Sequence, residues 1–217
     1  MGRIDYKKLY ELQDEVFEIV FRVENIFYLT GGTCLSRFYV EKRYSEDLDF
    51  FADASPRYAF AVRRLKVNFL ERFRLTVEVE AKDFTRFRIN DLLQIDFVNE
   101  YAPRHKDVIV TPSGYLIDNV ENILTNKLTA IIGRDNPKDI FDIYLIWKFY
   151  SFSWVEILDS AHKKAFFSDD ELIIRLKTFP TKLFNSLETT DPTFVDDFDQ
   201  DLPKIIEEIR ARCAHGV

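Results

Sequence analysis

The period of the hydrophobic pattern changes near residue 119, and this change limits the possible folds more than any other feature of the sequence. Before it, helical stretches are interspersed with short runs in which β-branched and aromatic residues alternate with polar ones, as in half-buried strands. After it, apolar residues recur every three or four positions, as in amphipathic helices. Strands are predicted over residues 26–30, 47–52, 75–81, 84–89 and 92–98. Helices are predicted over residues 5–23, 33–40, 55–72, 119–132, 137–150, 154–166, 169–177 and 202–213.

This pattern predicts an α+β fold in two parts. The first part, residues 1–118, is a small twisted mixed sheet flanked by helices, and the second, residues 119–217, is helical. The chain has 217 residues and is 47% hydrophobic, so it can bury a sizeable core. Because it has only 6 glycines and 7 prolines, long flexible linkers are not expected. Asn90-Asp91 is predicted to join two of the strands as a hairpin turn.

Charge and cysteine content exclude several classes of protein. The formal net charge of -7 argues against a surface coated with basic residues for non-specific DNA binding. Cys34 and Cys213 form neither a disulfide framework nor a CxxC pair for zinc. No apolar run approaches the ~20 residues of a membrane span, and the N-terminal residues do not resemble a signal peptide. A soluble, cytoplasmic protein without membrane contact is therefore expected.

Two carboxylates lie two positions apart in the predicted strand 47–52. Residues i and i+2 of a strand face the same side, so Asp47 and Asp49 project together while Leu48 turns into the core. Two such carboxylates repel each other unless a positive charge lies between them. Mg²⁺ is commonly held by one or two carboxylates plus substrate phosphates, and a pair of metal ions can clamp an in-line displacement. The pattern predicts a metal site here.

A third carboxylate, Asp96, lies in the apolar strand predicted over residues 92–98. Aspartate is rare inside strands, and it is costly to bury without a partner. A role as metal ligand or as general base would explain its position.

Gly31-Gly32-Thr33 follows a predicted strand and precedes a predicted helix. Glycines let the backbone approach a phosphate closely, and a helix N-terminus offers unpaired N–H groups and a positive dipole. The Thr33 hydroxyl can add a hydrogen bond. These residues are predicted to bind phosphate because the Asp-x-Asp strand and the Asp96 strand follow in order.

Together these features resemble the nucleotidyltransferase signature of the DNA polymerase β superfamily. More narrowly, Arg-Tyr-Ser-Glu-Asp-Leu-Asp-Phe-Phe at 43–51 is similar to the Arg-x-Ser-x-Asp-Z-Asp-Z strand of the AbiEii/AbiGii toxin family, where Z is apolar. The family pairs this strand with a Gly-Gly-Thr turn. Two helical motifs also match, Lys-Leu-x-Ala at 127–130 and Lys-Asp-x-x-Asp-Z-Tyr at 138–144. The resemblance spans residues 26–147, and residues from about 150 onward match no motif of the family.

The resemblance implies a role for each matching position. Asp47 and Asp49 would bind Mg²⁺ or Mn²⁺, and Asp96 would help to bind it or take the proton from the acceptor. Lys127, from the helical part, would hold the charge of a nucleoside triphosphate (NTP) in the cleft. Asp142, together with Asp139, would orient either that lysine or the nucleotide. The catalytic residues implied are Asp47, Asp49, Asp96, Lys127 and Asp142. The nucleotide contacts implied are Gly31, Gly32, Thr33, Arg43, Ser45, Lys127 and Asp139.

Several of these residues also have a purely structural interpretation. Without the resemblance, Lys127 would be taken for a surface lysine on a helix with an apolar face. Asp139 lies near a helix start, where acidic residues favour the helix dipole. Arg43 either binds phosphate or pairs with Glu46.

Two charged stretches are open to two interpretations each. The basic and aromatic residues of 57–74 either cover an aromatic core as a solvated face or bind an RNA backbone and its bases. The acidic residues of 189–201 form an exposed loop, which would also fit a basic partner.

The leading functional hypothesis is a Mg²⁺-dependent nucleotidyltransferase. By resemblance it would be the toxin of a bacterial toxin–antitoxin or phage-defence pair, with a cognate antitoxin. Its acceptor would be RNA, such as a tRNA 3′ end, or a protein. The alternatives are a small-molecule nucleotidyltransferase of the antibiotic-modifying type and a non-catalytic binding module that keeps the fold.

Overall fold

The computed structural model describes residues 4–216, which divide into two compact units. The sheet unit comprises the chain up to Cys34, Ser45–Tyr101 and Val108–Asp118. The helical unit comprises Leu35–Tyr44, Ala102–Asp107 and the chain from Asn119 onward. The predicted division into residues 1–118 and 119–217 stays a prediction. Among residues 4–216, no helix is both long enough and apolar enough to cross a lipid bilayer.

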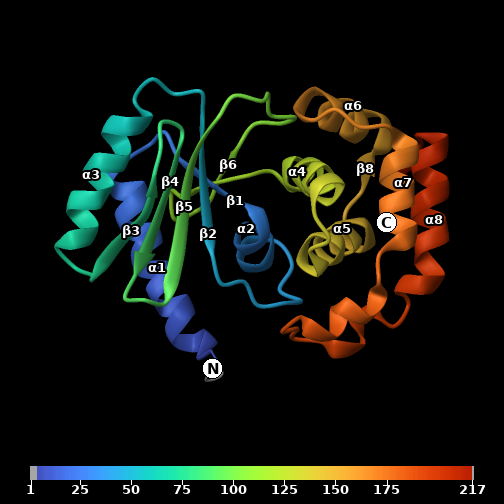
Figure 1. Ribbon diagram of the computed structural model, residues 1–217, viewed down its shortest axis with the longest axis horizontal. Coiled ribbons are helices and arrows are strands. Elements are labelled where there is room, and N and C mark those ends of the chain that lie inside the picture. Colours follow the sequence, from blue (N-terminus) through green and yellow to red (C-terminus); the bar gives the residue numbers. More distant parts are fainter. Residues whose placement is uncertain (1–3, 217) are drawn as a thin grey trace. The chain divides into compact units, whose positions relative to one another are not determined.

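The sheet unit is built on a seven-stranded mixed sheet with the strand order β3-β4-β5-β2-β1-β7-β6 (Figure 1). Its strands are β1 (Tyr28–Thr30), β2 (Leu48–Asp53), β3 (Leu75–Glu80), β4 (Phe84–Ile89), β5 (Leu93–Glu100), β6 (Ile109–Val110) and β7 (Leu116–Ile117). The central pair, β2 and β5, is parallel, whereas β2 pairs with β1 and β5 pairs with β4 in antiparallel fashion. The predicted α+β fold class is confirmed.

The predicted hairpin between β4 and β5 forms, but Leu92 belongs to its loop and β5 starts one residue later than predicted. Its turn residues Asn90 and Asp91 both have positive φ, 52° and 55°. Two successive residues of this kind make a type I′ turn, whose twist matches that of the flanking strands. Asparagine and aspartate tolerate this conformation better than other non-glycine residues.

Helices α1 (Tyr6–Val23) and α3 (Tyr58–Leu70) lie on one side of the sheet (Figure 1). Asp5 caps α1 by accepting a hydrogen bond from the Lys8 amide. The apolar face of α1 packs on β2, where Phe17 meets Phe50 edge to face with ring centroids 6.3 Å apart. Helix α3 starts at Tyr58, later than the predicted start at residue 55, because residues 55–57 form a turn. In this turn the Ser55 hydroxyl accepts from the Arg57 amide at 3.3 Å and the Ser55 carbonyl accepts from the Tyr58 amide at 3.1 Å.

The helical unit consists mainly of helices joined by short loops. They are α4 (Val120–Gly133), α5 (Pro137–Phe149), α6 (Trp154–Lys164), α7 (Asp169–Thr178), α8 (Phe198–Ala211) and the 3₁₀ turns η1 (Thr181–Ser186) and η2 (Pro192–Val195). Each of the first four starts at a polar N-cap side chain that accepts from an amide of the first turn, namely Asn119, Asn136, Ser153 and Ser168. A short strand pair, β8 (Phe152–Ser153) and β9 (Ala214–His215), accompanies them.

The acidic stretch 189–201 is largely exposed, as predicted, but it is not all loop and two of its residues are buried. It contains η2 and the first turn of α8, and Phe198 is buried with its ring 5.1 Å from that of Tyr144. Asp201 is buried as well. It accepts hydrogen bonds from Lys148 at 2.6 Å, Tyr144 at 2.7 Å and Lys204 at 2.8 Å. Because Phe198 packs in the core, α8 starts at residue 198 rather than at the predicted residue 202, and Asp201 is buried.

Asp201 is expected to make the protein sensitive to acid. Burial alone would raise the pKa of Asp201, but the hydrogen bonds from Lys148, Lys204 and Tyr144 outweigh it and lower that pKa to about 2. A carboxyl group with a folded pKa below its unfolded value of ~3.9 stabilises the fold above about pH 4, and this contribution is lost as the pH falls toward 2. Denaturant titrations between pH 5 and pH 2 should show the wild type losing about 2 kcal/mol more than Asp201→Asn.

The exposed Asp199 on the same helix supplies the matched control for this experiment. Asp199→Asn should reproduce the wild-type loss of stability in acid. An equal loss of unfolding free energy between pH 5 and pH 2 in the wild type and in Asp201→Asn would contradict the prediction.

Candidate active site

Asp49 and Asp96 lie side by side in the sheet unit. In the parallel pairing of β2 with β5, Asp49 is opposite Asp96 and Phe50 is opposite Phe97. The two phenylalanine rings stack in the core with centroids 5.4 Å apart. Because successive side chains alternate between the faces, the two carboxylates share the other face of the sheet.

Asp47 lies just before β2 and is exposed, so the predicted strand start at residue 47 is wrong. The reason is the length of β1, which ends at Thr30 opposite Asp49, where the next helix begins. No β1 residue is left to pair with Asp47. Its carbonyl instead accepts a short hydrogen bond from the Thr33 hydroxyl.

Gly31 brings the backbone directly against the Asp49 carboxylate. It opens helix α2 (Gly31–Phe38) with a φ of +71°. A Cβ atom at this position would lie 2.5 Å from Oδ2 of Asp49. Only glycine permits both this φ and this approach. The helix therefore starts two residues before the predicted start at residue 33, and its first turn contains the glycines, where backbone N–H groups have no partner within the helix.

Thr33 and Ser45 are buried and fix the loop that leads into β2. Their hydroxyl oxygens lie 2.8 Å apart. The Ser45 backbone is held on both sides, because its amide donates to the Tyr10 hydroxyl at 3.2 Å and its carbonyl accepts from Gln13 at 3.0 Å. These contacts position the residues immediately before Asp47.

Asp96 has an ion-pair partner that the sequence interpretation missed. Arg86 of β4 donates to its Oδ1 from Nε at 2.7 Å and to its Oδ2 from Nη2 at 2.6 Å. The hydrogen bond to Asp96 also raises the pKa of Arg86. In the hairpin register Ile89 is opposite Leu93, and this places Arg86 opposite Asp96. The predicted two-residue turn at Asn90-Asp91 would have placed Arg86 opposite Ile95, so the sequence did not indicate this pair.

The carboxylates of the sheet unit suit a hard divalent cation. Asp49 and Asp96 present oxygen atoms on one face, and the exposed Asp47 lies two residues before Asp49. Mg²⁺ accepts one or two carboxylates and completes its shell with water and phosphate oxygens. Both oxygens of Asp96 bind Arg86, so a metal ion at Asp96 would share that carboxylate with the arginine.

A second group of predicted residues meets inside the helical unit. Lys127 of α4 lies 2.8 Å from Oδ1 of Asp139 and 2.8 Å from Oδ2 of Asp142, both on α5. Arg43 donates to both oxygens of Asp142 at 2.7 Å, and Arg134 donates to Oδ2 of Asp139 at 2.7 Å. We call these five residues the Lys127 cluster. It combines three cations with two carboxylates, so its formal charge is +1.

The contacts of the Lys127 cluster test the structural alternatives that the sequence left open for Lys127, Asp139 and Arg43. Lys127 is 9% exposed and is not a surface lysine. Asp139 binds two cationic side chains, while Asn136 caps the helix. Arg43 is buried with Asp142, a partner that the sequence interpretation did not consider.

Both central groups of the Lys127 cluster are charged at neutral pH. Burial by itself would lower the pKa of Lys127, but the charges of Asp142 and Asp139 raise it above its usual value. Burial would raise the pKa of Asp142, and the cations Arg43 and Lys127 lower it. The cluster therefore keeps its surplus positive charge, which suits an anionic ligand such as a phosphate.

Family membership follows from the whole length of the chain. A model of the nucleotidyltransferase AbiEii toxin family, type IV toxin–antitoxin system, matches residues 20–212. The chain belongs to this family. The match includes both units and the residues after 150, in which the sequence analysis found no family motif.

The chain is also similar to three other proteins. The protein aq_aa25 of Aquifex aeolicus (strain VF5) is 27% identical over 172 residues, which cover 78% of this chain and 82% of that protein. The crystal structure of JHP933 from Helicobacter pylori aligns with a TM-score of 0.60 and 20% identity, covering 97% of this chain and 96% of the other. A second H. pylori structure, described as a candidate nucleotidyltransferase, aligns with a TM-score of 0.54 and 23% identity over 97% and 92%. The structural similarity agrees with a nucleotidyltransferase fold, and the family match identifies the chain as a nucleotidyltransferase enzyme.

Gly31 offers a direct test of the close approach to Asp49 in this AbiEii-family enzyme. Gly31→Ala should lower stability by about 1–2 kcal/mol, because a side chain strains a left-handed residue, and it should also abolish transfer because the new Cβ displaces the Asp49 carboxylate. Gly114→Ala is the matched control, with a φ of +80° and no atom within 4 Å of the added Cβ. Urea denaturation and a transfer assay would separate the two effects. Equal activity in both variants would refute the role of the close approach.

Proposed function

We propose that this AbiEii-family enzyme transfers a nucleoside monophosphate from an NTP to a macromolecular acceptor in a Mg²⁺-dependent reaction. The observation that carries the proposal is the pairing of Asp49 with Asp96 on one face of the sheet, with the Gly31 backbone against Asp49. Carboxylates beside unpaired helix N–H groups suit a substrate that is both metal-bound and polyanionic.

The residues of the sheet unit divide the work. Asp47 and Asp49 hold the metal ion, which when bound neutralises phosphate charge and stabilises the attacking and leaving oxygens. The backbone N–H groups of Gly31 and Gly32, in the first turn of α2, donate hydrogen bonds to phosphate oxygens. Thr33 and Ser45 support this turn and the loop before β2 through their buried hydroxyls.

The reaction forms one bond and breaks one. An acceptor oxygen attacks the α-phosphorus of the NTP, the bond from that phosphorus to the β-phosphate oxygen breaks, and pyrophosphate leaves. The proton of the acceptor passes to Asp96 or to water, and Arg86 holds the Asp96 carboxylate in place through its two hydrogen bonds. Such a reaction depends on positioning and charge rather than on covalent chemistry by the protein.

The Lys127 cluster supplies positive charge for the triphosphate. Lys127 acts as the phosphate-binding cation, and Asp139 and Asp142 hold its ammonium group at 2.8 Å each. Arg43 contributes by fixing Asp142.

The acceptor that we propose is RNA, such as a tRNA 3′ end, or a protein, and the partner in the cell is a cognate antitoxin. Membership of a family of toxins from type IV toxin–antitoxin systems supports this choice over a small molecule.

Label transfer tests the proposal. The purified enzyme is incubated with each of the four NTPs, labelled at the α-phosphate, and with total bacterial RNA, total protein or a mixture of aminoglycosides. We expect label in RNA or protein with Mg²⁺ or Mn²⁺, and none with EDTA. Label in the aminoglycosides alone would favour the small-molecule alternative. A folded protein that labels no acceptor would favour the non-catalytic alternative.

A further inference from the structure

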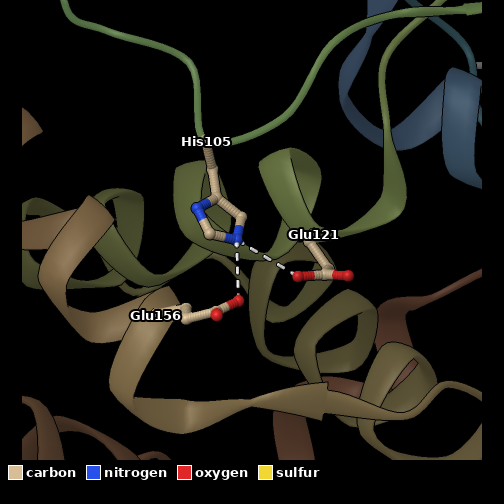
Figure 2. Close-up of side chains that lie close together, drawn as sticks. All are labelled: His105, Glu121 and Glu156. Atoms are coloured by element: carbon tan, nitrogen blue, oxygen red, sulfur yellow. Dashed lines mark hydrogen bonds and ion pairs between the residues drawn. The ribbon is translucent and has the colours of Figure 1, made fainter.

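Three potential metal ligands lie close together in the helical unit, and none of them has a role in the proposed transfer reaction. Figure 2 shows His105, from the segment 102–107, with Glu121 of α4 and Glu156 of α6 around its ring. Nε2 of His105 lies 3.2 Å from Oε2 of Glu121 and 3.8 Å from Oε2 of Glu156. One ligand atom from each residue lies within 4.8 Å of the other two.

The position of His105 is fixed by the backbone rather than by its ring contacts. Oδ1 of Asn122, a fully buried side chain, accepts from the amides of His105 and Lys106 at 2.8 Å each. The amide group of Asn122 also donates to the Lys106 carbonyl at 2.7 Å. The segment is therefore held on α4 independently of any ligand, and such preorganisation favours binding.

A hydrogen bond from His105 does not explain why the carboxylates of both Glu121 and Glu156 lie close to its ring. Nε2 of a histidine carries at most one hydrogen, so it can donate fully to one acceptor at a time. Glu156 also has an alternative, because Ser153 and Glu156 have the Ser-x-x-Glu spacing of a capping box, in which the glutamate turns back to the Ser153 amide. In Figure 2 its carboxylate is directed at the His105 ring.

We propose that His105, Glu121 and Glu156 bind one divalent transition-metal ion of the zinc type. Zinc bonds to nitrogen and oxygen of ~2.0–2.1 Å place tetrahedral ligands about 3.3 Å apart. The two distances from Nε2, 3.2 and 3.8 Å, bracket this separation. An imidazole ligand selects metals such as zinc over Mg²⁺, which prefers an all-oxygen shell.

The surroundings suit a three-ligand site with one open position. Lys106 binds Oε1 of Glu121 at 2.6 Å and so orients Oε2 toward His105. A cleft of about 380 Å³ beside His105 and Glu156 gives water and the ion access to the fourth position. The ion would join the segment 102–107 to α4 and α6 and so stabilise the helical unit.

Zinc titration of tag-free protein by calorimetry, in excess Mg²⁺ to occupy the carboxylates of the sheet, tests the site. We expect one zinc equivalent in the wild type and an affinity loss of at least about 100-fold in both His105→Ala and Glu156→Gln, since even indirect partners of metal ligands contribute 10–100-fold. Glu156 is largely exposed, so Glu156→Gln should fold normally. His162→Ala, which removes a histidine paired with Asp169, is the matched control and should bind zinc as the wild type does.

A second measurement distinguishes a built site from loose surface binding. Cobalt(II) added to the wild type should give the intense visible absorption of a tetrahedral ion, and Glu156→Gln should lose it. Zinc should raise the melting temperature of the wild type and of His162→Ala but not that of Glu156→Gln. Equal zinc affinity in wild type and His105→Ala, or no zinc binding by the wild type, would overturn the proposal while leaving the transfer reaction untouched.

Discussion

Asp49→Asn is expected to lower nucleotidyl transfer by about 100- to 1,000-fold while leaving the fold intact. The substitution keeps the size of the side chain and removes its negative charge from a site whose chemistry is charge neutralisation. Losing one positioned electrostatic group of an active site typically has an effect of this magnitude. The Asp49 side chain is half-buried on the polar face of β2, and the neighbouring Leu48 and Phe50 form the core, so asparagine should be accepted.

The same strand provides the control for this substitution. Asp53 ends β2 four residues later, on the same face of the sheet, and is exposed. Asp53→Asn should keep the wild-type rate within a small factor. The measurement is the rate of label transfer at saturating NTP. Equal rates in Asp49→Asn and Asp53→Asn would show that Asp49 has no role in the reaction.

Asp142→Ala is expected to lower the free energy of unfolding by about 3–5 kcal/mol. Asp142 is 1% exposed and balances two buried cations, the guanidinium of Arg43 and the ammonium of Lys127. Removing one member of a buried ion pair leaves its partners charged and poorly solvated, which is far more costly than losing a surface pair. Urea denaturation followed by circular dichroism would measure the difference.

Asp135→Ala is the control, because Asp135 pairs with Arg175 at 3.2 Å on the surface of the same unit. Exposed pairs contribute about 0–1 kcal/mol, so this variant should be near wild type. The double variant Arg43→Leu/Asp142→Leu should be less destabilised than the sum of its single changes, because it removes both charges together. A loss below 1 kcal/mol in Asp142→Ala would show that the Lys127 cluster is not electrostatically coupled.

Local sequence signals predicted most of the secondary structure. Asn90-Asp91 specified the turn of the β4–β5 hairpin, and Asn119 and Asn136 lie at the starts of α4 and α5, where the periodicity placed two helices. Errors arose at element ends, where tertiary contacts compete with local preference. Helix α3, for example, starts at Tyr58 rather than at residue 55, and the Ser55 amide donates to Asn99, forty-four residues later.

The site was predictable in its residue types but not in its pairings. The Asp-x-Asp pattern and the apolar strand around Asp96 pointed to the carboxylates directly. Arg43 and Asp142, by contrast, are ninety-nine positions apart, and no local pattern indicates which acid a buried arginine meets. Arg86 was missed for a different reason: a two-residue turn at Asn90-Asp91 puts it opposite Ile95, and only the three-residue loop of the structure puts it opposite Asp96. His105 meets Glu121 and Glu156 only through the course of the chain between β5 and β6.

The most direct test of the central claim is calorimetric NTP binding with and without Mg²⁺, in wild type and in Asp49→Asn. The claim that the carboxylates of the sheet hold a metal ion for the triphosphate predicts binding of at least one NTP by the wild type in Mg²⁺, and loss of that binding both in EDTA and in the variant. NTP binding that is equally strong in Asp49→Asn, or no binding of any of the four NTPs by the folded wild type, would contradict the claim.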